Sequence, residues 1–199
     1  MKKPISFEYL VDALKSLPGI GNKQAERIAY FLILKDDKFI KDFIERINES
    51  HEKIHFCKQC NNFADGEFCD ICLNKSREQD KLCIVSSIED LQKIEETGSY
   101  VGLYYVLQGE IDVKSKTNID SNSIRKLMNW LKSHSFDEII LATNWTINGE
   151  ATAVFVKKII NELTNANVYR LALGLPINSA LDYADNMTLK FAIKNKTKY

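Results

Sequence analysis

The sequence lacks a long apolar run, an excess of either charge and an internal repeat. No stretch of about twenty apolar residues is present, so we expect no membrane-spanning helix. The 27 basic residues balance the 27 acidic residues, so any surface that attracts nucleic acid must be local. Residues 1–4 lead into amphipathic sequence rather than an apolar segment. We therefore expect no signal peptide and a cytoplasmic protein.

The rest of the composition is that of a soluble globular protein. Hydrophobic residues make up 45% of the 199 residues and charged residues 27%. This length accommodates one large domain or two to three small ones.

Four of the five cysteines form two C-x-x-C pairs, Cys57 with Cys60 and Cys69 with Cys72. Each pair can present two thiolates to one metal, and four sulfurs in a tetrahedron suit Zn²⁺. Such a site has no open coordination position, so we expect one structural zinc per chain. Two disulfides, a redox C-x-x-C or an iron–sulfur cluster are the alternatives. The fifth cysteine, Cys83, lies in an apolar run and is interpreted as part of a buried strand.

The N-terminal part is predicted to be helical, over residues 7–17, from residue 22 through 32, and over 38–54. Gly19 and Gly21 lie in the break between the first two helices, and Asn22 is the expected N-cap of the second helix. Glycines at such a turn let the backbone approach a phosphate, which the first amides of the next helix then face. Lys23 and Arg27 share one face of that helix. We interpret Gly19, Gly21, Lys23 and Arg27 as a sequence-independent DNA contact; a plain helical hairpin is the alternative.

Beyond a polar linker at residues 74–80, apolar strands alternate with helices. The strands are expected at 82–85, 103–107, 138–143 and 168–172, and the helices at 88–98, 123–134 and 151–164. This alternation predicts an α/β domain with a mainly parallel sheet.

The order of these features resembles the bacterial recombination mediator family RecR. The resemblance rests on Leu17–Gly21, the four cysteines, 140–144, 149–153 and Gly174-Leu175-Pro176. It covers essentially the whole chain. It implies a helix-hairpin-helix domain at 1–54, a zinc-finger module at 55–76, a Toprim-like domain at 77–172 and a C-terminal oligomerisation segment at 173–199.

Catalytic Toprim domains hold Mg²⁺ with a Glu after the first strand and an acid pair after a later strand. Here Ser86 stands at the first position and Asn144 at the later one, so we expect no catalytic residues. Asn144 and Glu150 are interpreted as partner-binding residues. Glu150 alternatively serves as a favourable charge at a helix N-terminus.

Two loops depart from the family pattern. Residues 109–114 lack the usual Pro-Gly turn, and Asn178-Ser179 replaces a Gly-Gly pair in the tail. The glycine pair to which the family pattern ascribes a nucleotide or phosphate contact in that tail is therefore absent from this chain.

The resemblance implies a non-enzymatic DNA-binding mediator of recombinational repair. It would form a homo-oligomer, a dimer or a ring-shaped tetramer, and act with RecO, in other contexts RecF, to load RecA on single-stranded DNA. A protein-interaction adaptor without DNA contact and a metal-dependent Toprim nuclease are the alternatives.

Overall fold

The computed structural model describes residues 3–172, 174–175, 178 and 180–196. The chain divides into two compact units, residues 1–53 and 54–199. Each unit is described by itself.

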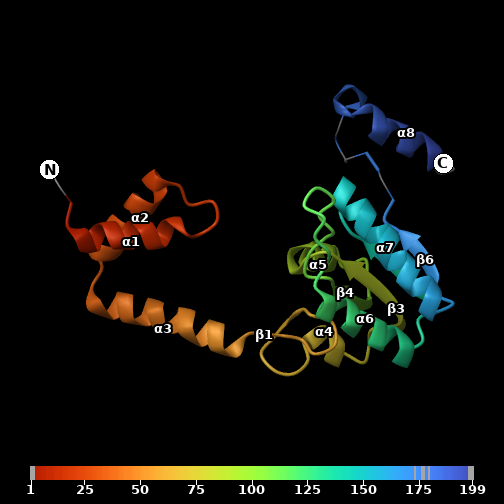
Figure 1. Cartoon of the computed structure of the whole chain (residues 1–199), viewed down its shortest axis with the longest axis horizontal. Coiled ribbons are helices and arrows are strands. Elements are labelled where there is room, and N and C mark those ends of the chain that lie inside the picture. Colours follow the sequence, from red (N-terminus) through yellow and green to blue (C-terminus); the bar gives the residue numbers. More distant parts are fainter. Residues whose placement is uncertain (1–2, 173, 176–177, 179, 197–199) are drawn as a thin grey trace. The chain divides into compact units, whose positions relative to one another are not determined.

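The first unit consists of three helices, α1 (Ile5–Lys15), α2 (Asn22–Ile33) and α3 (Asp37–Lys53) (Figure 1). Its small core joins Phe7 and Val11 of α1 to Ala25 and Ala29 of α2. Both alanines are fully buried, and their short side chains let the two helices approach closely. The predicted helical hairpin is therefore present.

The backbone conformation of the turn between α1 and α2 requires glycine at one of its two glycine positions. Gly19 has a φ of +77°, which only glycine adopts without cost. Gly21 has an ordinary extended backbone and is itself the N-cap of α2. The prediction that Asn22 caps this helix was wrong, because Asn22 is already its first helical residue.

Helix α3 has no buried residue. Its apolar residues Phe39, Phe43, Ile44 and Ile47 are exposed, and the rings of Phe39 and Phe43 stack with centroids 6.2 Å apart. The unit thus presents more apolar surface than its own core covers.

The second unit begins with the cysteine module. It comprises β1 (His55–Phe56), β2 (Phe63–Ala64) and the short helix α4 (Asp70–Leu73), with β1 and β2 antiparallel. Cys57, Cys60 and Cys69 belong to the same buried cluster as residues of the following sheet. The module is therefore packed on the α/β domain rather than standing alone.

A four-stranded parallel sheet forms the centre of this unit, in the order β4-β3-β5-β6. Its strands are β3 (Glu78–Val85), β4 (Gly102–Val106), β5 (Glu138–Ala142) and β6 (Asn167–Arg170). The connecting helices are α5 (Ile88–Glu95), α6 (Ser121–Ser133) and α7 (Ile147–Leu163). The α/β prediction is confirmed.

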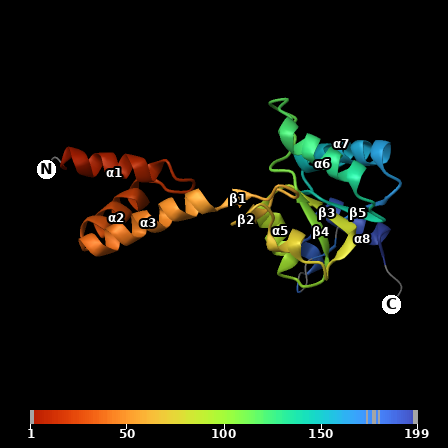
Figure 2. The same cartoon turned by 90° about the horizontal axis from the view of Figure 1, so that it is seen from below.

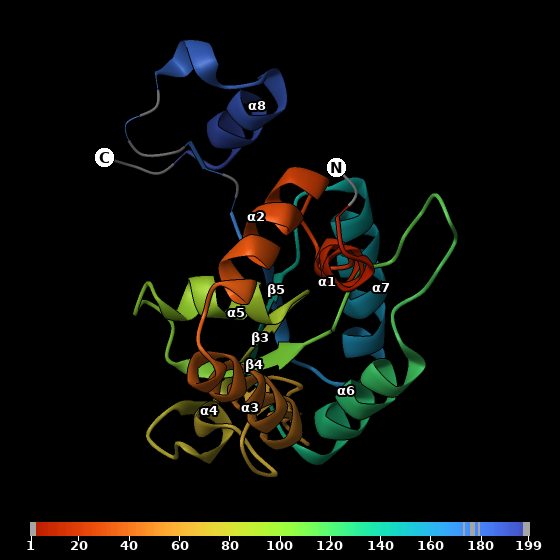
Figure 3. The same ribbon diagram turned by 90° about the vertical axis from the view of Figure 1, so that its left-hand side faces the viewer.

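The helices cover both faces of the sheet, α6 and α7 on one side and α5 on the other (Figures 2 and 3). The side chains divide accordingly. Cys83, Val85, Tyr104 and Val106 face the α5 side, while Leu82, Ile84, Leu103 and Tyr105 face the other. Cys83 is buried as expected, and burial raises the pKa of its thiol to about 12.

Two elements begin four residues earlier than predicted. Strand β3 begins at Glu78, inside the expected linker. The sequence did not indicate this start, because the first residues of the strand are exposed and carry no apolar pattern. Helix α7 begins at Ile147, four residues before the expected start. The Thr146 hydroxyl caps it by accepting a hydrogen bond from the Gly149 amide.

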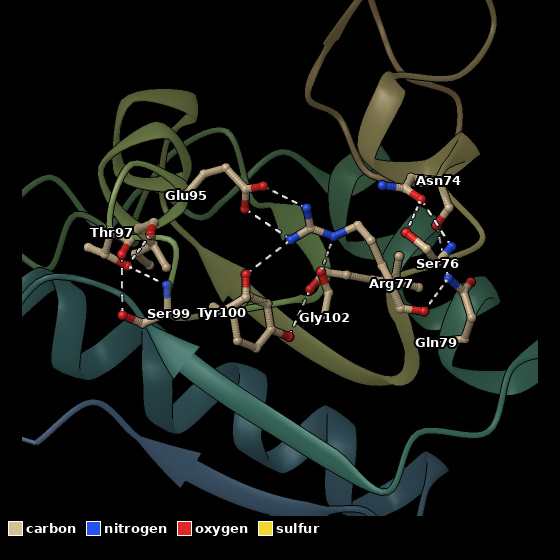
Figure 4. A network of polar contacts seen from close by, with 11 residues as sticks. Asn74, Ser76, Arg77, Gln79, Glu95, Thr97, Ser99, Tyr100 and Gly102 are labelled. Carbon is tan, nitrogen blue, oxygen red and sulfur yellow. Dashed lines mark hydrogen bonds and ion pairs between the residues drawn. The ribbon is translucent and has the colours of Figure 1, made fainter.

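Arg77 fixes the entry to β3 (Figure 4). Its guanidinium forms two hydrogen bonds to the carboxylate of Glu95, at 2.6 and 3.0 Å, and donates to the carbonyls of Gly102 and Tyr100. This pairing with Arg77 lowers the pKa of Glu95. One side chain thereby ties the segment after the cysteine module to α5 and β4.

The described part of the tail contains a short 3-10 helix (Leu181–Tyr183) and α8 (Asn186–Lys194). The Asp185 carboxylate caps α8, and Phe191 lies against Trp145, with ring centroids 5.9 Å apart. Pro176 and Ser179 of the predicted tail motif lie outside the described residues. No helix in the described part of the chain is both long and apolar enough to cross a membrane.

Candidate zinc centre and Toprim corner

The four paired cysteines converge on one point. Their sulfur atoms all lie within 4.8 Å of one another, with Cys57 and Cys72 3.8 Å apart and Cys60 and Cys69 3.5 Å apart. Tetrahedral zinc with Zn–S bonds of about 2.3 Å requires S···S separations of roughly 3.8 Å. The clustering of the four sulfurs therefore fits one four-coordinate zinc.

The surroundings of the sulfurs also favour a bound dication. Hydrogen bonding to Cys57 raises the pKa of the Cys60 and Cys72 thiols, whereas hydrogen bonding to Cys60 lowers the pKa of Cys57. Four adjacent thiolates repel one another and do not form together without a cation. Two backbone amides point at sulfur, that of Cys69 to Cys57 at 3.4 Å and that of Asn62 to Cys60 at 3.5 Å. A metal offsets the repulsion, and the amides stabilise the thiolates around it. The site fits a structural zinc and leaves no ligand position for substrate.

Asn61 connects this centre to the sheet and was missed by the sequence analysis. Its amide nitrogen donates to the carbonyl of Val106 at 3.0 Å and to the hydroxyls of Tyr105 and Ser123 at 3.1 and 3.2 Å. Its carbonyl accepts a 2.5 Å hydrogen bond from Lys126. Because Asn61 is only 3% exposed, these bonds are shielded from water.

Backbone contacts reinforce this connection. The amide of Val106 donates to the carbonyl of Cys60 at 2.8 Å, so the cysteine loop occupies hydrogen-bonding positions beside β4. Lys126 of α6 also donates to the carbonyl of Cys57. The zinc module and the α/β domain thus share one hydrogen-bond network.

At the same carboxyl ends of the strands, Ser86, Asn144 and Glu110 form a group that we call the Toprim corner. Ser86 follows β3 and Asn144 follows β5, and both donate to one carboxylate oxygen of Glu110. The distances are 2.7 Å from Ser86 and 3.0–3.1 Å from Asn144. Glu110 comes from the loop after β4. Only the parallel topology, which gathers the carboxyl ends of the strands at one edge, could have pointed to it.

This corner offers little to a magnesium ion. Apart from the four cysteines, no group of three or more His, Cys, Asp or Glu residues in the described part of the chain can converge on a cation. Glu110 is engaged by neutral donors, and one carboxylate is a poor Mg²⁺ site.

Arg170 joins the two predicted partner-binding residues. Its guanidinium donates to the Glu150 carboxylate at 2.8 Å and to the Asn144 carbonyl at 3.0 Å. It also lies over the ring of Trp145, 4.4 Å from the centroid. Glu150 therefore has an internal partner, while its side chain is still 47% exposed.

The four predicted DNA-contacting residues lie together in the first unit. Gly19 and Gly21 form the turn before α2, and Lys23 and Arg27 stand exposed on the first two turns of that helix. The carboxylate of Glu26 between them is paired with Lys3 at 2.8 Å. The positive charges of Lys23 and Arg27 are thus not neutralised by this neighbouring acid.

These elements define a class of protein in which a helical hairpin, a four-cysteine zinc finger and a parallel Toprim-type sheet follow one another in a single chain. Family models match in that order: a RecR helix-hairpin-helix at residues 7–50, a RecR four-cysteine zinc finger domain at 54–74, a Toprim domain at 80–172 and a RecR C-terminal region at 174–197. The chain belongs to the RecR family.

Full-length relatives agree. The chain is 44% identical over 198 residues to recombination protein RecR of Ureaplasma urealyticum, covering 100% of this chain and 98% of that protein. It is 37% identical to recombination protein RecR of Natranaerobius thermophilus, with 98% and 96% coverage. The corresponding protein of Lactobacillus acidophilus is 36% identical, with 99% of each chain covered.

Proposed function

We propose that this chain is a non-enzymatic, DNA-binding mediator of recombinational DNA repair in the cytoplasm. It acts with RecO, and in other contexts with RecF, to help load RecA on single-stranded DNA. The observation that carries the proposal is the exposed pair Lys23 and Arg27 beside the Gly19 turn, in a RecR-family chain whose Glu110 carboxylate is engaged by the neutral donors of Ser86 and Asn144.

The DNA contact follows from the hairpin. The first amides of α2 have no acceptor within the helix and carry the positive end of its dipole. A Cβ added to Gly19 or Gly21 would meet no atom within 4 Å, so the turn is open to an incoming phosphate. Lys23 and Arg27, one helical turn apart, then reach neighbouring phosphates. Such contacts ignore base sequence.

A salt titration separates this proposal from the adaptor alternative. We expect labelled single-stranded DNA to bind the zinc-loaded protein with an affinity that falls linearly on a logarithmic salt scale. The titration is run with the protein alone and again with RecO present, and RecO alone is the control. An adaptor without DNA contact would leave the DNA anisotropy unchanged in the first titration. In the second titration it would leave the salt slope of DNA binding equal to that of RecO alone.

The nuclease alternative is disfavoured by the corner residues. Ser86 and Asn144 present neutral oxygens and nitrogens, and their donors already occupy Glu110. We therefore expect no cleavage of DNA with Mg²⁺ or Mn²⁺. Metal-dependent cleavage that Glu110→Gln abolishes would overturn this part of the proposal.

Self-association follows from uncovered apolar surface. Helix α3 exposes Phe39, Phe43, Ile44 and Ile47, and the 1–54 and 173–199 segments would each provide one two-fold contact. Two such contacts close into a ring, in which weak DNA contacts add through effective concentration. Light scattering should give the mass of a dimer or tetramer; a monomer at high concentration, with and without DNA, would remove the ring.

Asn144 and Glu150 are our candidates for partner contact at the Toprim corner. The Arg170 guanidinium bonds to both residues, and the Glu150 side chain is partly exposed to solvent. Charge reversal by Glu150→Lys should weaken RecO binding while leaving zinc content unchanged. Unaltered RecO affinity would assign Glu150 to the helix N-terminus alone.

A further inference from the structure

Two phenylalanines of the zinc module form an exposed aromatic pair. Phe56 and Phe63 stand opposite each other in the β1–β2 ladder, with ring centroids 5.8 Å apart and planes inclined by 23°. Their exposed fractions are 55% and 51%. Adjacent half-exposed rings on a rigid scaffold are typical anchors of protein contacts.

Three hollows adjoin the Phe63 ring. Their volumes are about 740, 410 and 430 Å³. The largest extends past Glu89 to Glu110, and the other two extend along Asp70. None of the residues lining the three hollows is a lysine, arginine or histidine, so the concave surface around Phe63 carries charge of one sign.

Several of these acids are not neutralised from within. Glu95 and Glu96, at one margin, are paired with Arg77 and Lys93. Within the described residues, Asp65, Asp70 and Glu89 form no ion pair. Unpaired acids around an apolar anchor favour a cationic partner and repel phosphates.

We infer that Phe56, Phe63, Asp65, Asp70 and Glu89 form a docking surface for a lysine- or arginine-rich protein segment that carries an apolar anchor residue. We name it the Phe63 surface. The anchor fills a hollow against the ring of Phe63, and the cations pair with the acids or lie over the aromatic faces. Asn144 lines the far end of the largest hollow, so the Phe63 surface borders the proposed partner-binding residues. The inference rests on the aromatic pair and the unpaired acids and not on the partner proposed for Asn144 and Glu150.

The chemistry also separates two tasks between the two units. The cations proposed to bind phosphate, Lys23 and Arg27, lie on α2 of the first unit, whereas the Phe63 surface of the second unit is acidic. Nucleic acid is therefore excluded from the Phe63 surface by like charge, and a basic protein segment is favoured there.

The test uses the zinc-loaded full-length protein and three fluorescent eight-residue peptides. The first alternates lysines with leucine and phenylalanine, the second replaces every lysine by glutamate, and the third replaces every apolar residue by serine. Anisotropy titrations should show binding of the first peptide and much weaker binding of the other two, because both charge and anchor are required.

Two variants locate the binding. Phe63→Ser should weaken the first peptide roughly tenfold, as expected for an interface anchor. Glu89→Lys should weaken it severalfold and flatten its salt dependence. Tyr169→Ser, at an aromatic residue of β6 with 52% exposure, is the matched control and should change nothing. Zinc content measured on each variant confirms an intact module, and Glu89→Lys tests the inference even where Phe63→Ser fails to fold.

Three results would contradict the Phe63 docking surface. Equal binding of the glutamate peptide, or affinity unaffected by Glu89→Lys and by a folded Phe63→Ser, would overturn the inference. So would a drop in oligomer mass of Phe63→Ser with unchanged peptide binding, because the Phe63 surface would then join two copies of this chain.

Discussion

Truncation of Asn61 should uncouple the zinc module from the sheet. Asn61→Ala removes the donor to Val106, Tyr105 and Ser123 and the acceptor of Lys126. Leaving such buried partners unsatisfied costs about 1–3 kcal/mol. Asn61 also has a φ of +63°, where alanine is disfavoured by about 1–2 kcal/mol. We expect the free energy of unfolding to fall by about 3 kcal/mol in total.

Urea denaturation followed by tryptophan fluorescence measures this loss. Trp130 is 7% exposed and its ring centroid lies 6.1 Å from that of Tyr105, so it reports on the affected region. Asn61→Gly removes the same bonds without the backbone cost and should recover about 1 kcal/mol. Asn62→Ala is the matched control, because its side chain takes no part in this network.

Refutation is straightforward in this series. A loss below about 0.5 kcal/mol for Asn61→Ala, or an equal loss for Asn62→Ala, would show that Asn61 does not hold the module in place. Hydrogen exchange at the Val106 amide, which donates to the Cys60 carbonyl, gives a local check and should accelerate only in the Asn61 variants.

Three further results are expected. Elemental analysis should find one zinc per chain, and Cys60→Ser should lose it together with the folded module; a folded, metal-free wild type would contradict the zinc assignment. Gly149→Ala should destabilise the protein by about 3 kcal/mol or more in thermal melts, because the added Cβ would lie 2.0 Å from the Asn144 carbonyl oxygen. Pairing with Arg77 lowers the pKa of Glu95, so it stabilises the fold above the carboxyl's unfolded pKa of about 4.3. The stability advantage of wild type over Glu95→Gln should therefore be full near pH 7 and fade as the pH falls below about 4; an advantage independent of pH would exclude the ion pair as its source.

The element types could be predicted from the sequence because their apolar periodicity is strong. The cysteine centre was equally predictable, since ligand spacing alone restricts the geometry. The polar start of β3 escaped prediction because Glu78, Gln79 and Asp80 are exposed and leave no apolar pattern. Sequence reasoning also placed the start of α7 too late, since Gly149 resembles a turn residue but is needed for the close approach to Asn144.

The missed residues of the site have a common cause. Asn61 and Glu110 act through partners that are more than twenty positions distant, Tyr105 for the first and Ser86 for the second. Neither residue belongs to a spacing pattern, and a polar residue in a loop is ordinarily solvated. Only the packing of the module on β4 and the meeting of the strand ends gives these two side chains their roles.

The central claim is a sequence-independent DNA contact at the α2 hairpin, and salt-dependent DNA binding by the Lys23→Ala/Arg27→Ala double variant tests it most directly. Each lost phosphate contact should lower the slope of log affinity against log salt by roughly one unit, to the same extent for all DNA sequences. Lys157→Ala/Lys158→Ala on α7 serves as the charge-matched control. A reduced slope in the hairpin variant alone supports the account. An unchanged affinity and slope in that variant would contradict it.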